Sequence, residues 1–162
     1  MDFALSIREA NLNDLAKIKQ IIGLSFPRFF RFFASQSVDA EEGKVLVTIA
    51  QGTVVGFVKL IEFQIGRVKY GCILWIAVHP AFRRKGIAYA LTNAGFESLK
   101  KEGSKAVFAS TQHRNSAAKG ALGKAVFRRM GFLDLWQLFG WRVFIFYREI
   151  WYAPGEIVFM HS

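Results

Sequence analysis

The chain has 162 residues, of which 52% are hydrophobic, so it can bury a sizeable core without disulfides or metals, and we expect one domain over residues 1–162 and no metal site. No apolar run approaches the roughly 18 residues of a membrane span, and the start Met1-Asp2-Phe3 lacks the regions of a secretory signal, so we expect a cytoplasmic protein. The net charge of +10 favours an anionic partner, which could be nucleic acid, an acidic protein or a polyphosphate cofactor.

The first half of the chain predicts a strand, two helices and an antiparallel meander. A short strand over 5–9 precedes Asn11 or Asn13, either of which would cap a helix whose apolar stripe is Leu15, Ile18, Ile21 and Ile22. A second helix is expected from Pro27 to the polar loop at 39–43. Turns at 52–53 and 66–71 then separate three expected strands, which cover 44–51, 54–65 and 72–78.

The second half changes from a strand period to a helical one. Ile87, Leu91, Ala94 and Leu99 share one helix face, and Gly103 ends that helix. A strand is expected over 105–111, and a helix over 115–130 with Gly131 as its cap. The aromatic stretch 136–152 could be one long strand, or a strand with a short helix, before a last strand at 156–160. The pattern is that of a mixed α/β (α+β) fold.

Two groups of residues have both a structural and a functional interpretation. Phe29-Phe30-Arg31-Phe32-Phe33 would place Phe29, Phe30 and Phe33 on one helix face, which favours a packed helix or a tunnel lining over a platform for RNA bases. The single cysteine, Cys72, lies in an apolar strand without a neighbouring His or Asp, so we expect a buried structural thiol.

The segment between the apolar strand and the helix near Gly86 has the physics of a phosphate cradle. A helix start exposes unpaired backbone N–H groups and a partial positive charge. Gly86 would let an anion approach the backbone closely, and Arg83, Arg84 and Lys85 add three cations. A solvated basic turn is the alternative interpretation. Neither a G-x-G-x-x-G motif after a strand nor a Walker loop is present.

This segment resembles the cofactor loop of the GNAT superfamily of N-acyltransferases, Gln/Arg-x-x-Gly-x-Gly/Ala, which is matched by Arg83-x-x-Gly86-x-Ala88. Residues 75–80 look like the family's fourth strand and its exit, and the opening at 7–15 is similar to the family's usual start. Asn115, followed by a helix and by Phe127-Arg128-Arg129-Met130-Gly131-Phe132, resembles the second cofactor segment. The resemblance covers nearly the whole chain.

The resemblance implies a central twisted mixed sheet of about six to seven strands with flanking helices. Two parallel strands, here 72–78 and 105–111, would splay apart to admit the pantetheine arm of acetyl-coenzyme A (acetyl-CoA). The backbone of Ile76, Ala77 and Val78 would pair with pantetheine amides. Backbone amides from Arg84 to Ala88, including Ile87, would hold the pyrophosphate, and Asn115 would touch the cofactor from the far side of the slot.

The implied activity is transfer of an acetyl group to an amine, which must first lose a proton. Glu62 is the leading candidate for the base because it interrupts an apolar strand. The alternative interpretation is a solvent-facing strand residue without a catalytic role. His113 is a weaker choice. Phe127 stands where many members of the family have a proton-donating tyrosine, so either Tyr147 or Tyr152 substitutes, or the thiolate leaves without help.

The sequence therefore predicts an acetyl-CoA-dependent N-acetyltransferase acting on a protein N-terminus, a lysine or a small amine, as a monomer or a homodimer. The alternative is a non-catalytic coenzyme A (CoA)-binding or nucleic-acid-associated protein on the same fold, which the charge of +10 and the missing tyrosine support. The same positive charge disfavours a polycationic acceptor.

Overall fold

A single seven-stranded mixed sheet runs through the computed structural model, which describes residues 4–162, so Met1-Asp2-Phe3 lies outside the described residues. The strands are ordered β1-β2-β3-β4-β5-β7-β6, and all neighbours are antiparallel except β4 and β5. Their bounds are Ser6–Glu9 (β1), Lys44–Ala50 (β2), Thr53–Ile65 (β3), Val68–Val78 (β4), Val107–Gln112 (β5), Arg128–Met130 (β6) and Glu156–His161 (β7). The expected mixed sheet is confirmed.

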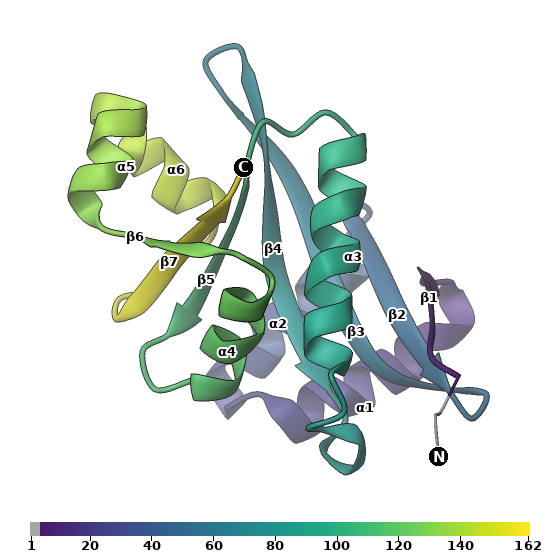
Figure 1. Cartoon of the computed structure of the whole chain (residues 1–162). Helices are drawn as coiled ribbons and strands as arrows, with labels where there is room; N and C mark the ends of the chain where they lie inside the picture. The colour runs from purple at the N-terminus through teal and green to yellow at the C-terminus, as the bar shows by residue number, and fades with distance from the viewer. Residues whose placement is uncertain (1–3) are drawn as a thin grey trace.

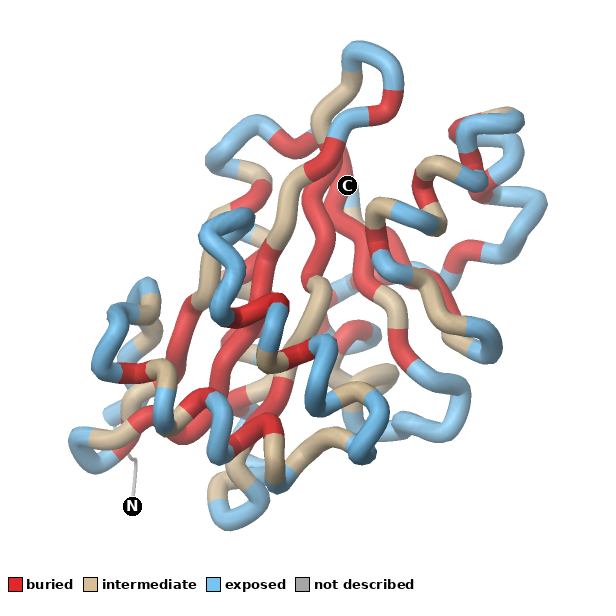
Figure 2. Tube along the Cα trace, turned by 180° about the vertical axis from the view of Figure 1, so that it is seen from behind, coloured by how far each residue is buried: buried red, intermediate tan, exposed pale blue. Residues whose placement is uncertain are grey.

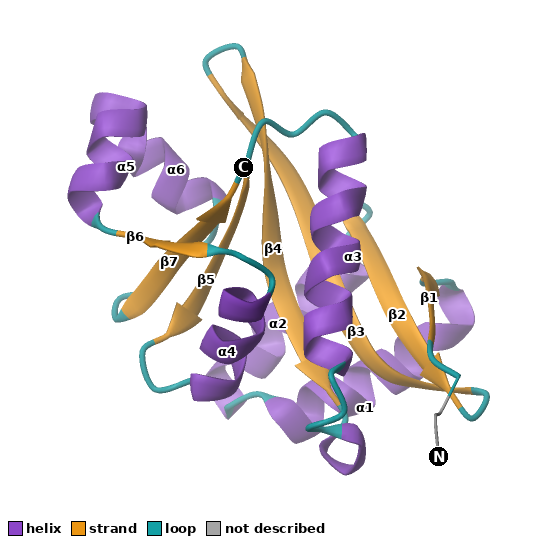
Figure 3. Ribbon diagram, viewed as in Figure 1, coloured by secondary structure: helices purple, strands orange, loops and turns teal. Residues whose placement is uncertain are grey.

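Helices cover both faces of this sheet (Figures 1 and 3). Helices α3 and α4 lie on one face, here called the α3 face, and α1, α2, α5 and α6 lie on the other, the α2 face. The α-helices are Leu15–Ser25 (α1), Arg28–Asp39 (α2), Ile87–Lys101 (α3), Ser116–Lys124 (α4), Phe132–Phe139 (α5) and Val143–Glu149 (α6), with short 3-10 turns at Leu12–Asp14, Pro80–Phe82 and Gly140–Arg142.

Local sequence signals account for several of these boundaries. Asn11, one of the two expected caps, accepts a hydrogen bond from the Asn13 amide and forms a capping box with Asp14. Pro27 immediately precedes α2, where the missing N–H of proline costs the helix no hydrogen bond. Lys100 and Lys101 lie in the last turn of α3, where cations complement the helix dipole.

The helix expected over 115–130 is wrong beyond Lys124. Val126 adopts φ +64°, and the Phe127 amide bonds back to the Leu122 carbonyl, which closes α4 and turns the chain into strand β6. Gly131 does not end that helix. It begins α5 instead, where its amide donates to the Asp134 side chain at 2.7 Å.

The aromatic stretch 136–152 is helical, and the expectation of a strand there is wrong. The buried side chains of this stretch and of the residue before it recur every three or four residues, a helical period: Leu135, Phe139, Val143, Phe146 and Ile150. Exposed aromatic residues lie between them, with Trp141 67% and Phe144 65% exposed, and they hide the period in the sequence.

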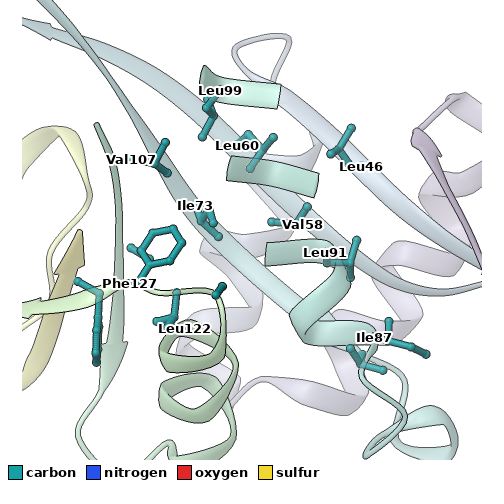
Figure 4. Close-up of a cluster of buried hydrophobic side chains, with 14 of the residues drawn as sticks. Leu46, Val58, Leu60, Ile73, Ile87, Leu91, Leu99, Val107, Leu122 and Phe127 are labelled. Carbon is teal, nitrogen blue, oxygen red and sulfur yellow. The ribbon is translucent and has the colours of Figure 1, made fainter. Parts of the chain in front are cut away.

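Three hydrophobic clusters form the core around the central strands, which are buried along much of their length (Figure 2). The largest lies on the α3 face, where Leu60, Ile73, Leu91, Leu99 and Phe127 converge (Figure 4). The other two lie on the α2 face, one beneath α1 and α2 and one beneath α5 and α6. Cys72 is fully buried in the latter, as expected.

Helix α2 packs differently from the expected single face of Phe29, Phe30 and Phe33. Its buried residues are Ala34, Ser37 and Val38, and only Phe30 turns inward, to the Trp75 ring 6.2 Å away. Phe29 is 69% exposed and packs edge-to-face on Phe33 at 5.2 Å. The reason is that small side chains let α2 approach the sheet more closely than a row of phenylalanines would.

Candidate functional site: an anion cradle beside parted strands

The predicted cradle is the entry to helix α3. Arg84 and Gly86 adopt positive φ values of +63° and +77°, which turn the backbone sharply before the helix begins at Ile87. Gly86 is the N-cap without a side-chain cap, and the first intrahelical bond runs from Ala90 to Gly86. The N–H groups of Ile87, Ala88 and Tyr89 therefore have no acceptor within the helix.

Open space adjoins Gly86, because a Cβ atom built on it would meet no heavy atom within 4 Å. The flanking side chains Arg83, Arg84 and Lys85 are all exposed, and the Lys85 ammonium lies 5.2 Å from the centre of the Phe82 ring. An anion at this helix start would meet backbone N–H donors, three cations and the positive end of the dipole of a 15-residue helix. The residues present thus fit a pyrophosphate group.

Strands β4 and β5 part directly beside this cradle (Figure 3). They pair only from Gly71–Val107 to Ile73–Ala109, although β4 continues to Val78 while still paired with β3. A bulge at Leu74, where Lys59 pairs with Trp75 and Leu60 with Ile73, coincides with the point of parting. Residues 74–76 are only partly buried in the middle of the sheet, so the parted strands leave room for an elongated ligand.

Backbone direction decides which β4 groups can reach that ligand. The His79 amide donates to Val55 of β3, and backbone groups along a strand alternate in direction. Those of Ala77 therefore point to β3, while those of Ile76 and Val78 point to the side that β5 has left. The Val78 carbonyl oxygen already accepts a hydrogen bond from Arg83 Nε at 3.2 Å. Of the three residues predicted to pair with pantetheine, Ile76 and Val78 have the matching orientation.

Asn115 begins helix α4 on the other side of the parted strands. Its Oδ1 accepts a hydrogen bond from the Ala118 amide at 3.0 Å, and the residue is exposed. The N-termini of α3 and α4 lie at the same end of the sheet, where β4 and β5 have diverged (Figure 1). Asn115 therefore lies opposite the cradle, and its carboxamide N–H₂ group is free to donate to a ligand there.

The structure does not bring Glu62 to this place. Glu62 pairs with Gly71, before the strands part, and its Oε1 lies 2.7 Å from Lys69 Nζ. It belongs to the α3 face at the C-terminal end of α3, and Leu99 packs directly over Gly71. That helix end is about 22 Å from the cradle at 1.5 Å per residue. The role of Glu62 as base stays a prediction, and its contacts are those of a surface ion pair.

Phe127 lies in the core cluster on the α3 face, edge-to-face with Phe96 at 6.1 Å. The two tyrosines considered as its substitutes lie on the α2 face with ring centres 4.6 Å apart, and the Tyr152 hydroxyl donates to the Glu156 carbonyl at 3.2 Å. Burial, followed by the neighbouring Tyr152, raises the pKa of Tyr147 above its usual range. His113 is exposed in the loop after β5.

Two serines near the parted strands carried no signal in the sequence. Ser25, at the end of α1, lies 3.3 Å from Arg83 Nη2 and 3.5 Å from the Val78 carbonyl oxygen. Ser110 follows the last β5 residue that pairs with β4 and donates to the Glu156 carboxylate at 2.9 Å. Isolated serines at a helix end and in a strand have no diagnostic spacing, so only the fold could reveal them.

A cavity of about 350 Å³ lies elsewhere, beside β1 and the turn between β2 and β3. It is open, and Arg8, Asp14, Lys17 and Thr53 are among its lining residues. Arg8 and Asp14 form an ion pair there, and the guanidinium lowers the pKa of the Asp14 carboxyl. Because none of the cradle residues lines it, this cavity has no part in the site.

A sheet with one pair of parted parallel strands, and an anion cradle at the adjoining helix start, is typical of proteins that bind an elongated ligand carrying phosphate groups. Comparison with known families agrees with that class. Residues 12–132 match the model of the acetyltransferase (GNAT) family, and the chain belongs to this family. A search of curated proteins finds no match to the chain.

Solved structures share the fold at low sequence identity. A putative GNAT-family acetyltransferase from Desulfovibrio desulfuricans has a TM-score of 0.75 at 15% identity, over 98% of this chain and 99% of its own. An acetyltransferase from Bacillus subtilis, solved with CoA, has a TM-score of 0.70 at 15% identity, over 98% of both chains. The ribosomal-protein-S18-alanine N-acetyltransferase from Escherichia coli has a TM-score of 0.64 at 18% identity, over 96% of this chain and 90% of its own.

No helix in residues 4–162 combines the length and the apolar character that crossing a membrane requires. The same described residues hold no group of three or more His, Cys, Asp or Glu side chains placed to bind a metal ion.

Proposed function

We propose that the protein is an N-acetyltransferase that takes the acetyl group from acetyl-CoA and transfers it to an amine. The observation that carries the proposal is the open cradle at Gly86, located where β4 and β5 part. Pyrophosphate oxygens would accept hydrogen bonds from the amides of Arg84 to Ala88. The backbone of Ile76 and Val78 would bind the pantetheine amides, and Asn115 would donate from the opposite side.

The thioester supplies an activated acetyl group, and the protein has to orient it and lower the cost of charge at the reacting carbonyl. Direct attack by the amine needs no covalent enzyme intermediate. The bulge at Leu74 supports this role, because it turns backbone groups of β4 toward the parted strands at mid-sheet. The acceptor would approach from the α2 face, because the cradle at the start of α3 would hold the nucleotide part of acetyl-CoA on the other one.

The acceptor we propose is a single amine on a neutral or acidic molecule. The protein carries a net charge of +10, and Arg28 and Arg31 of α2 are exposed at the face from which the acceptor would approach. Both features repel a lysine-rich tail. Faster turnover of polylysine peptides than of neutral peptides would contradict this acceptor class.

Two experiments test the proposal, first cofactor binding and then turnover. A ligand at 100 times its dissociation constant stabilises the folded state by about 2.7 kcal/mol, so saturating acetyl-CoA should raise the melting temperature by several degrees. Release of the CoA thiol in the presence of amines should then identify the acceptor. A melting curve that saturating acetyl-CoA leaves unchanged would remove the basis of the proposal.

The second candidate is a nucleic-acid-associated protein on the same fold, which the net charge favours and which the missing tyrosine at Phe127 also supports. Salt distinguishes the two. Nucleic-acid affinity falls steeply between 50 and 200 mM salt through counterion release. Affinity for acetyl-CoA, much of which is neutral pantetheine, should fall far less. Tight nucleic-acid binding without acetyl-CoA binding would favour this second candidate.

A further inference from the structure

Ser110 marks the end of the contact between β4 and β5. Ala109 is the last β5 residue that pairs with β4, and Ser110 is the next. Its neighbour Phe108 packs beneath α5 and α6 on the α2 face, and side chains alternate along a strand, so Ser110 also points to that face. This is the face from which the proposed acceptor would approach.

Two hydrogen bonds fix the side chain of Glu156, the first residue of β7. The Ser110 hydroxyl donates to Glu156 Oε2 at 2.9 Å, and the Ala153 amide donates to the same oxygen at 3.0 Å. The side chain thereby reaches back diagonally across β5, because Glu156 itself pairs with Gln112. Within residues 4–162 the other carboxylate oxygen, Oε1, accepts no hydrogen bond from protein, so it remains available to a ligand.

The surroundings of Glu156 distinguish it from Glu62, the other carboxylate considered as a base. None of the ion pairs among the described residues includes Glu156, whereas Glu62 is paired with Lys69. The titratable groups recorded around it are Tyr152, whose hydroxyl donates to the Glu156 carbonyl oxygen, and Cys72 of β4. Tyr147 of α6 contacts Tyr152, with the two ring centres 4.6 Å apart. Burial, followed by the charge of Glu156, raises the pKa of the Cys72 thiol. The hydrogen bond to Ser110, the residue after the last β4–β5 pair, places the carboxylate close to the point of parting.

Resting on the proposed function, we propose that Glu156 binds the ammonium group of the acceptor through Oε1 and takes its proton, with Ser110 as its positioning residue. The amine nitrogen gives one proton to the Glu156 carboxylate, which passes it to solvent. Its lone pair forms the C–N bond to the acetyl carbon, the C–S bond breaks, and the thiolate leaves with the bonding pair. The second nitrogen proton, lost as the amide forms, neutralises the thiolate.

The substitution Glu156→Gln isolates this role. Both hydrogen bonds of the side chain converge on Oε2, so the glutamine carbonyl oxygen can keep both, while an N–H₂ group that can neither bind a cation nor accept a proton replaces Oε1. We expect kcat/KM at pH 7 to fall about 10²-fold for the best lysine-like alkylamine of a screen, with acetyl-CoA affinity and melting temperature unchanged. Ser110→Ala, which loosens the carboxylate, should cause a smaller loss.

The pH profile separates proton transfer from a merely structural role. The variant can use only acceptor that is already unprotonated, and that fraction rises tenfold per pH unit below the amine pKa, which is about 10.4 for a lysine-like amine. The 10²-fold loss should therefore shrink between pH 7 and pH 9. It should also be small for an aryl amine, which is neutral at pH 7.

The matched control is Glu149→Gln, which changes a carboxylate of α6 that is paired with Arg148, 2.6 Å away. It should keep wild-type turnover. Equal turnover by wild type and Glu156→Gln would overturn the proposal and leave the proposed function standing, as would a pH-independent loss. If Glu62→Gln loses 10²-fold and Glu156→Gln does not, the base is Glu62. Wild type that binds acetyl-CoA but acetylates no amine would overturn both proposals.

Discussion

The Arg83 guanidinium caps the end of β4, because its Nε donates to the carbonyl oxygen of Val78 at 3.2 Å. Its Nη2 also reaches the Ser25 hydroxyl at 3.3 Å, so one side chain joins the cradle, the last residue of β4 and the end of α1. A guanidinium has five N–H donors, and these two contacts leave others for an anion. Arg83 thus combines structural bracing with positive charge.

This bracing predicts that Arg83→Ala weakens acetyl-CoA binding by about tenfold, through one lost charge and a less well fixed loop. The dissociation constant of the variant should also depend less on salt, since one fewer cation faces the pyrophosphate. Isothermal titration at two salt concentrations measures both effects. Lys101→Ala, at the opposite end of α3, is the matched control, and an equal loss in that variant would mean that net charge alone is responsible.

The positive φ of Gly86 predicts how the cradle should be blocked. A valine here would strain the backbone, whereas asparagine tolerates the left-handed region and still fills the open space. Gly86→Asn should therefore abolish the thermal shift produced by acetyl-CoA at a cost in stability of about 1 kcal/mol. Gly103→Asn, at φ +96° beyond the other end of α3 and equally open, should cost as much stability and leave binding intact.

Lys59 predicts a stability that depends on pH in a defined direction. The residue is 2% exposed, its Nζ donates to the Ala40 and Glu42 carbonyl oxygens, and burial lowers its pKa, with the charge of Glu42 acting in the opposite sense. The folded state therefore holds fewer protons than the unfolded state between the lowered pKa and 10.5. The free energy of unfolding must therefore rise as the pH increases from the lowered pKa to 10.5. Below the lowered pKa it stays at its lower value.

The variant Lys59→Met has no proton to lose at this position and no buried charge. It should raise the free energy of unfolding at pH 7 by about 1 kcal/mol, because the two carbonyl oxygens belong to exposed residues that water can reach. Urea unfolding at pH 7 and pH 9.5 should show the wild type gaining on the variant as the pH rises. A constant difference between them would contradict the proposed titration.

Cys72 predicts that the native protein does not react with thiol reagents. Its side chain is fully buried and burial raises its thiol pKa, so the reactive thiolate is scarce as well as inaccessible. Disulfide reagents should modify it only at the rate of unfolding, and quickly in urea. Rapid modification of the folded protein would show that the cluster beneath α5 and α6 opens locally.

The sequence predicted the cradle and the meander because their signals are local. Gly86, the cations before it and the apolar helix face after it all lie within a few residues of one another. The helices over 132–149 were not predicted, because the exposed side of this stretch is as aromatic as its buried side and hydrophobicity alone did not show the helical period. Glu62 attracted attention as a charge in an apolar strand, yet the partner that explains it, Lys69, is visible only once β3 pairs with β4.

The pair formed by Ser110 and Glu156 could not have been predicted in this way. Forty-six residues separate them, and their contact depends on β7 returning beside β5 after α5 and α6. No motif or spacing in the sequence singles out Glu156. Its relation to the parted strands follows from the register of β7, which no short pattern encodes.

The close packing of Leu99 over Gly71 makes the cradle sensitive to a distant methyl group. A Cβ atom on Gly71 would come within 2.8 Å of the Leu99 side chain, so an alanine there would push the C-terminal end of α3 away from the sheet. A helix of 15 residues moves as a rod, and its other end carries the amides that would hold the pyrophosphate. Relatives that carry a larger residue at this position should therefore also carry a smaller one opposite it.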